Sequence, residues 1–272
     1  MPSPAKSDDV TRLSNGTLLL ALTGWMDGGD VSTGTIRQLM AERKLSEIGE
    51  IDPAGHYIDN FPGSMELAAL FRPTVKYVDG MIESFEMPSN RIWLDATANM
   101  AFFVGKEPNI DWTGFADTLF DLCEKLDIGR IIFMGSFGGA VPHTREPRLY
   151  GSVSDRALLP LLSKFGLKPT EYEGPASFAT YLLSRAPSHD LEMLSIAAEI
   201  PGYLTGANPL CIEAVTRRLA RLLNLPVKLD TLRQESTAWE LEVTEAVQKD
   251  EDLVKTVRKL EAQYDDELIE SG

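Results

Sequence analysis

Short, continuous apolar runs alternate along the chain with segments whose apolar residues recur every three or four positions. The continuous runs predict strands buried on both faces, because such strands have no polar side to present to water. They lie at residues 17–22, 101–104, 131–134 and 191–200. The segment at 74–78 alternates in polarity after Pro73, which predicts an edge strand at the rim of a sheet, paired with 81–87.

Helical periodicity fills the intervals between these strands. Helices are expected at 30–40, 113–126, 154–165, 176–185 and 208–223. Asp30 and Asn208 are suitable N-cap residues, and Gly166 is suited to ending the third helix. A strand, a helix and a further strand between residues 101 and 134 make a complete βαβ unit. The alternation predicts an α/β fold, a layered sandwich around a mostly parallel central sheet.

Composition divides the chain into three parts. Residues 1–14 lack an apolar pattern and are expected to be disordered, whereas residues 15–231 carry the α/β pattern. Residues 232–272 are expected to form an acidic, amphipathic helical tail, with 12 Asp and Glu against 5 Lys and Arg, a net charge of −7. One stripe of this C-terminal helical appendage either packs on the α/β body or contacts another protein.

The whole chain has a formal net charge of −15 and an isoelectric point near 4.7. This charge argues against nucleic acid and anionic membranes as partners, because phosphates are held by clustered Lys and Arg. No stretch approaches the roughly 18 apolar residues of a membrane span, and the first residues lack the apolar core of a signal peptide. With only two cysteines, far apart, the sequence favours a cytoplasmic protein without disulfides.

A glycine-rich segment at 135–145 follows the third apolar run directly and ends in His143, Thr144 and Arg145. It is predicted to be a loop at the carboxyl end of a strand, which is where ligands bind in α/β sheets. A loop that gathers an imidazole, a hydroxyl and a guanidinium is the first candidate for a functional site.

Arg145 is the strongest chemical indication in this loop, because a guanidinium pairs bidentately with a carboxylate or a phosphate. With Thr144 and the glycine amides it could form an anion pocket, or it could pair with Asp27 or Glu107 from neighbouring strand-end loops. The alternatives are a rigid loop with a structural salt bridge and a contact with another protein.

Catalytic and metal motifs are weak. Ser136 stands one position too early for the G-x-S-x-G nucleophile elbow, and His143 would need an orienting carboxylate to act as a general base. The three histidines are isolated and the two cysteines are far apart, so no metal site is expected. The loop at 24–29 lacks the G-x-G-x-x-G spacing of dinucleotide-binding proteins, and no cofactor is expected.

Five short segments occur in an order that resembles a known family. They are Gly24-Trp25-Met26-Asp27-Gly28-Gly29, Gly105-Lys106-Glu107-Pro108, Pro142-His143-Thr144-Arg145, Tyr172-Glu173-Gly174-Pro175, and Pro201-Gly202-Tyr203-Leu204 with Asn208-Pro209. Together they resemble the proteasome assembly chaperone 2 family in its actinobacterial form, over residues 15 to 230. The resemblance implies an α/β fold related to phosphorylase/hydrolase-like sandwiches, homo-oligomerisation, with a trimer as one form, and a role in protein assembly.

The candidate residues for binding a ligand or a partner follow from these motifs and from the aromatic residue in the first strand-end loop, which is expected to lie partly in the core or to anchor an interface. They are Trp25, Asp27, Gly28, Glu107, His143, Thr144, Arg145 and Tyr203. All of them are expected to gather at the edge of the sheet where the parallel strands end.

These sequence features are compatible with two functions. The first is a non-enzymatic, homo-oligomeric, assembly-chaperone-like protein whose strand-end loops or tail bind another protein, with proteasome components as the implied partners. The alternative is a hydrolase or small-anion-binding enzyme that uses His143 and Arg145. A closed pocket joining these two residues to Asp27 or Glu107 would favour the enzyme, and a broad exposed apolar patch would favour the protein-binding function.

Overall fold

The structure is a computed structural model, and it describes residues 12–271. The predicted disorder of residues 1–14 therefore lies mostly outside the described residues. Within them, Leu13 is buried and its backbone N–H donates to the Leu126 carbonyl oxygen.

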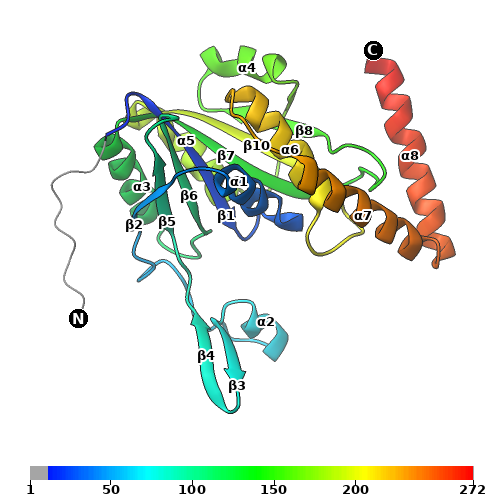
Figure 1. Ribbon diagram of the computed structural model, residues 1–272, viewed down its shortest axis with the longest axis horizontal. Coiled ribbons are helices and arrows are strands. Elements are labelled where there is room, and N and C mark those ends of the chain that lie inside the picture. Colours follow the sequence, from blue (N-terminus) through cyan, green and yellow to red (C-terminus); the bar gives the residue numbers. More distant parts are fainter. Residues whose placement is uncertain (1–11, 272) are drawn as a thin grey trace.

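The central sheet has eight strands in the order β2-β5-β6-β1-β7-β10-β8-β9 (Figure 1). Their bounds are β1 Gly16–Thr23, β2 Ser46–Glu50, β5 Arg91–Asp95, β6 Met100–Lys106, β7 Ile128–Gly139, β8 Leu149–Val153, β9 Lys168–Pro169 and β10 Glu192–Pro201. The four central strands, β6, β1, β7 and β10, are parallel neighbours, and β5 and β8 flank them in antiparallel pairings. The predicted α/β fold with a mostly parallel sheet is confirmed.

Helices cover both faces of this sheet. The covering helices are α1 Val31–Ala41, α4 Leu159–Lys164 and α6 Pro209–Leu222 on one face, and α3 Trp112–Leu126 and α5 Phe178–Arg185 on the other. Successive side chains of β1 point to opposite faces of the sheet. Leu19 and Ala21 pack in the core under α1 and α6, and Leu18 and Leu20 pack in the core under α3 and α5. Short 3-10 turns occur at Gly28–Asp30, Arg156–Leu158 and Ala186–His189.

Strand β7 is longer than the sequence predicts. The segment from Gly135 to Gly139 is not a loop, because β7 pairs with β10 as far as Gly139 and Pro201. Glycine is required at the end of this pairing, since a Cβ atom on Gly139 would lie 2.3 Å from Glu199 Oε1. The strand β8, which pairs antiparallel with β10, was also not predicted.

A small arm projects from the body in Figure 1 and carries a separate two-stranded sheet. It consists of β3 Thr74–Val78, β4 Met81–Glu86 and the short helix α2 Met65–Ala69. The predicted pairing of these two strands is confirmed, but their predicted place at the rim of the main sheet is wrong.

The predicted C-terminal helical appendage is present as α7 Asp230–Val247 and α8 Glu251–Ser271. A tight turn at 248–250 joins the two helices, and Val257 and Tyr264 of α8 are buried. Between residues 12 and 271, no helix is long and apolar enough to cross a membrane.

Replacing Gly139 by alanine is expected to lower the free energy of unfolding by about 1–3 kcal/mol, because the added methyl group would displace the buried Glu199 side chain. Gly138→Ala is the matched control, since a Cβ atom there meets only Gly202 Cα at 3.5 Å. Urea denaturation of both variants measures the difference. Equal losses in the two variants would show that the close approach at Gly139 is not a constraint.

Candidate functional site

The parallel strands β1, β6, β7 and β10 end at the same edge of the sheet, as Thr23 pairs with Lys106 and Gly139 with Pro201. The loops that leave these strands carry all of the candidate residues. Contacts within these loops divide the candidates into two groups, one around Glu107 and Asp27 and one around His143 and Arg145.

The Glu107 carboxylate ties the first strand-end loop to helix α5. Its Oε2 accepts from the Trp25 backbone N–H at 2.9 Å, and its Oε1 accepts from the Phe178 backbone N–H at 2.8 Å. Gly24 adopts φ +131°, and a Cβ atom there would lie 3.0 Å from Glu107 Cβ, so glycine is needed for this approach. Glu107 thus fixes the spacing between Trp25 and the start of α5.

Asp27, and not Asp30, supplies the side-chain cap of α1. Its carboxylate accepts from the Thr33 backbone N–H at 3.1 Å and from Thr33 Oγ1 at 2.8 Å. Asp30 occupies the N-cap position with φ 54° and makes no side-chain cap bond, so its predicted capping role is wrong. Burial raises the Asp27 pKa to about 6, although the two bonds from Thr33 act in the opposite direction.

The Ser136 hydroxyl is committed to the same loop. It donates to the Gly28 carbonyl oxygen at 2.6 Å, and the Ser136 backbone N–H donates to the Met26 carbonyl oxygen at 2.8 Å. Ser136 is fully buried. The hydroxyl therefore fastens the β1–α1 loop to β7 and is not presented as a nucleophile.

His143 is buried, with 2% of its surface exposed, and both ring nitrogens have partners. The Tyr203 hydroxyl accepts from the His143 backbone N–H at 2.9 Å and lies 2.7 Å from Nδ1 of the ring. The other ring nitrogen, Nε2, lies 3.1 Å from Thr244 Oγ1 of α7. Burial lowers the His143 pKa and keeps the ring neutral.

Helix α8 covers Thr144 and Arg145. Arg145 makes a bidentate pair with Asp265, with Nε–Oδ1 at 2.9 Å and Nη2–Oδ2 at 2.8 Å, and Nη1 lies 3.9 Å from Glu261. Thr144 Oγ1 donates to Glu261 Oε1 at 2.5 Å. These tail carboxylates raise the pKa of Arg145 and occupy the place that an external anion would take. The alternative that Arg145 pairs with Asp27 or Glu107 is wrong.

A second cation, Arg148, lies beside this contact and was not identified from the sequence. It pairs with the buried Glu199 at 3.2 Å and with Glu267 of α8 at 3.0 Å, and its guanidinium lies 4.5 Å from the Tyr264 ring centroid. Glu199 Oε1 also accepts from the Ala140 backbone N–H at 2.7 Å. No motif marks Arg148 and Glu199, because they meet only through the pairing of β8 and β10.

A cleft of about 860 Å³ lies beside this contact, and Lys168, which lines it, lies 3.8 Å from Glu267 of α8. The aromatic side chains that line this aromatic cleft are those of Trp25, Phe137, Tyr150 and Tyr172. Tyr150 and Phe137 stand 5.6 Å apart between ring centroids. Trp25 and Tyr172 are 67% and 66% exposed and Phe137 is 38% exposed, so three of the four rings are open to a partner. His143 and Arg145 do not line it.

Small side chains on the α5 side of the sheet make the floor of the aromatic cleft. Ser195 and Ala197 of β10 lie beside Ser152 of β8 there. Ser195 and Ala197 lie on the same face of β10 as Met193, which packs in the core under α3 and α5. The intervening residues of β10 pack in the core on the other face of the sheet. At alternate positions of β10 the side chains change from methionine to serine and alanine. This change is the sequence signal that could have indicated an open cleft at the end of the strand.

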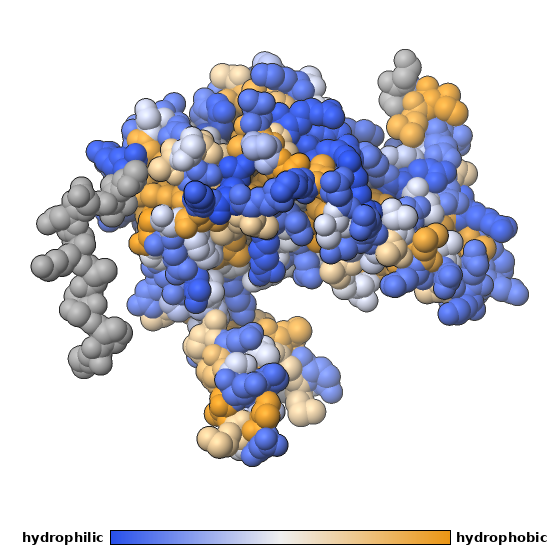
Figure 2. Space-filling view, viewed as in Figure 1, coloured by the Kyte–Doolittle hydropathy of each residue, from blue (hydrophilic) through white to orange (hydrophobic). Residues whose placement is uncertain are grey.

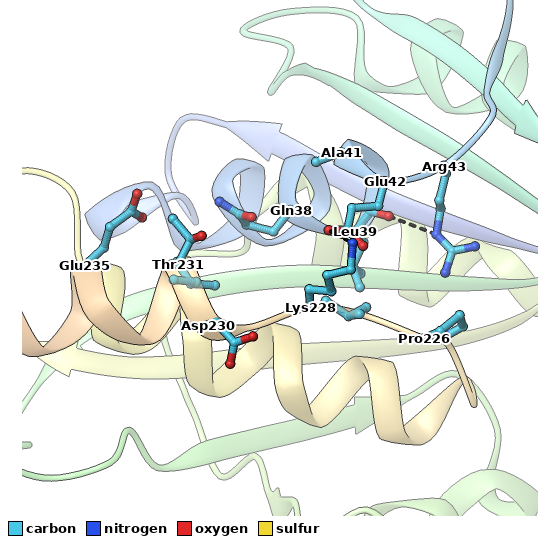
Figure 3. Close-up of a pocket in the computed structure, with 12 residues that line it drawn as sticks. Gln38, Leu39, Ala41, Glu42, Arg43, Pro226, Lys228, Asp230, Thr231 and Glu235 are labelled. Carbon is cyan, nitrogen blue, oxygen red and sulfur yellow. Dashed lines mark hydrogen bonds and ion pairs between the residues drawn. The ribbon is translucent and has the colours of Figure 1, made fainter.

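A polar pocket of about 200 Å³ lies at the opposite, amino-terminal edge of the sheet (Figure 3). It is formed by the end of α1 and the segment that leads into α7, with Gln38 and Glu235 among the labelled side chains. Lys228 pairs there with Glu42 at 3.4 Å. None of the candidate residues lines this pocket, so it is separate from the strand-end site.

Asp27→Asn is expected to become more stable relative to the wild type as the pH rises from 4 to 7, by on the order of 2 kcal/mol. The Asp27 pKa is about 6 in the folded chain against 3.8 for the free side chain. As the pH rises, Asp27 therefore loses its proton in the unfolded chain before it does so in the folded chain. The stability contributed by protonated Asp27 is complete below pH 4 and is lost as the pH rises through 6. Chemical denaturation at several pH values measures this, and a relative gain by the wild type would show that the charged cap is favourable.

Comparisons with known proteins agree with this architecture. The PAC2 family matches residues 21–247 of the chain. A comparison with curated proteins gives no match.

Solved structures give a close match in fold. A proteasome-assembly chaperone homologue from Mycobacterium tuberculosis is 28% identical, covers 89% of this chain and 99% of its own, and has a TM-score of 0.75. A second protein from that organism, of unknown function, is 21% identical, covers 100% and 93%, and has a TM-score of 0.83. An archaeal homologue of proteasome-assembly chaperone from Pyrococcus furiosus is 16% identical, covers 86% and 92%, and has a TM-score of 0.63. Since the family match spans most of the chain, the protein belongs to the PAC2 family.

Proposed function

We propose that this protein is a non-enzymatic, assembly-chaperone-like protein that binds a proteasome-related protein through the aromatic cleft. The observation that carries the proposal is the contrast between the two groups of candidates. His143 and Arg145 are engaged by the chain's own helices α7 and α8, whereas Trp25 and Tyr172 are exposed beside a preformed cleft.

The aromatic cleft has the properties of a protein-binding surface. Exposed Trp and Tyr side chains bury a large area at low entropic cost and are enriched among residues that dominate binding energy. The Trp25 backbone N–H is held by Glu107, and the Tyr172 hydroxyl donates to the Pro175 carbonyl oxygen at 3.2 Å. A partner would therefore meet two aromatic residues that each have a contact within the protein.

The enzyme alternative lacks an accessible set of groups. A general base must reach the proton of a substrate, but His143 has both nitrogens bonded and only 2% of its surface exposed. The Arg145 fork is filled by Asp265. A hydrolase function would require α7 and α8 to leave this face.

The relatives support the type of partner. The Mycobacterium tuberculosis structure is a proteasome-assembly chaperone homologue, and another structure with the same fold is an archaeal proteasome activator from Pyrococcus furiosus. By this analogy we propose proteasome components as partners, homo-oligomerisation, and a cytoplasmic location. We also propose the division into an α/β domain at 15–231 and a tail at 232–272, whose helix α8 meets the body through ion pairs and hydrogen bonds beside the buried Val257 and Tyr264.

Affinity purification from the native cytosol with mass spectrometry tests the proposed function. The wild-type chain is expected to recover proteasome subunits, and Trp25→Ser combined with Tyr172→Ser is expected to reduce their recovery by at least about tenfold. Both side chains are largely exposed, so the fold should be unaffected.

Leu159→Ser is the matched control, because Leu159 is 48% exposed on α4 and does not line the aromatic cleft. This variant should recover the same proteins as the wild type. Equal recovery by all three chains would exclude the aromatic cleft as the binding site, and absence of proteasome subunits from the wild-type sample would overturn the proposed partner.

A further inference from the structure

A cavity of about 430 Å³ lies between the base of the arm and the body. Thr74 and Glu86 line this cavity, and they pair at the end of the hairpin opposite its turn. Figures 1 and 2 show that this end of the arm meets the body at a narrow neck. The segments 71–74 and 86–89 form the arm side of the cavity, and residues of α1, β1 and β6 form the body side.

The body side of the cavity lies where two neighbouring parallel strands end. Thr23 of β1 pairs with Lys106 of β6, and both residues line the cavity. The carboxyl ends of parallel strands are the usual place for ligands in α/β sheets. The volume also falls in the range of cavities that bind small molecules. The cavity shares no lining residue with the aromatic cleft, so it is a separate site.

Three cationic side chains from separate elements line the cavity. Arg37 comes from α1, Arg72 from the segment between α2 and β3, and Lys106 from the end of β6. Glu86 is the one carboxylate among the described residues that line it, so the lining has a net charge of +2. The whole chain has 41 Asp and Glu against 26 Lys and Arg, so the cavity reverses the charge of the protein locally.

The charges of these three cations are not neutralised within the chain. Between residues 12 and 271, none of them forms an ion pair with a carboxylate. Arg72 Nη2 donates to Asn60 Oδ1 at 3.1 Å, and Lys106 Nζ lies 5.7 Å from the Tyr57 ring centroid. Neutral groups therefore orient two of the cations. Because like charges around one cavity repel one another, a bound anion would be stabilised there.

We infer that this cavity binds a small multivalent oxyanion, a molecule that carries phosphate or carboxylate groups. The two guanidinium groups offer planar pairs of donors that match either group, and the Lys106 ammonium adds a compact positive charge. Because Arg72 belongs to the arm and Arg37 to the body, the bound anion also joins the arm to the body. This site does not depend on the function proposed for the aromatic cleft.

Isothermal titration calorimetry at fixed ionic strength tests this site, with pyrophosphate and citrate as probes for phosphate and carboxylate groups. The wild-type chain is expected to bind at least one probe at a single site, and the tighter probe identifies the group that the cavity takes. Arg37→Gln should weaken this binding by about tenfold or more, because it removes a charge-assisted contact. Arg37 is exposed, so the fold should be unaffected.

Arg221→Gln is the matched control, because Arg221 is also exposed on a helix of the body, α6, but does not line the cavity. This variant should bind the probe as the wild type does. No binding of either probe by the wild type, or equal affinity in the wild type and Arg37→Gln, would overturn the inference.

Hydrogen–deuterium exchange of the wild-type chain gives a second readout, which needs no variant. Saturation with the bound probe should slow exchange at 71–74 and 86–89, because the anion holds the arm side of the cavity against the body. Unchanged exchange in both segments would show that the anion binds elsewhere and would also overturn the inference.

Discussion

The parallel pairing of β7 with β10 as far as Gly139 and Pro201 is the constraint on which the rest of the structure depends. This pairing extends both strands to the carboxyl edge of the sheet. It places Glu199 where its carboxylate pairs with Arg148 and accepts from the Ala140 backbone N–H. One side of these strands becomes the floor of the aromatic cleft, and the loop that leaves them receives helix α8. A large residue at Gly139 would disturb both surfaces at once.

Part of the sheet edge is consequently covered by α7 and α8, and the neighbouring part, the aromatic cleft, is open. Acidic side chains of α8 neutralise Arg145 and Arg148, and α7 completes the hydrogen bonds of His143. The strongest chemical indication in the sequence is thus used within the molecule, as a structural contact between body and tail. The aromatic cleft offers aromatic side chains and small polar groups, which suit the recognition of another protein better than the chemistry of a bond-breaking step.

Much of the fold could be predicted, because strands buried on both faces and amphipathic helices leave strong local patterns. The site was predicted only in part. Trp25 and Glu107 were recognised as candidates, but contacts such as Arg145 with Asp265 join residues 120 positions apart. Local pattern contains no information on such pairs. The continuation of β7 through Gly135–Gly139 was missed because glycine normally indicates a turn, whereas here it allows close packing against Glu199.

We propose that the partner binds in the aromatic cleft, and not on the part of the sheet edge under α8. Hydrogen–deuterium exchange of the protein, alone and with the recovered partner, tests this proposal. We expect slower exchange at 25–26, 137–138 and 168–175, which border the aromatic cleft, with no change at 142–145 and no release of α8. Slower exchange at 142–145, together with faster exchange in α8, would contradict this proposal. It would indicate that His143 and Arg145 take part in the function.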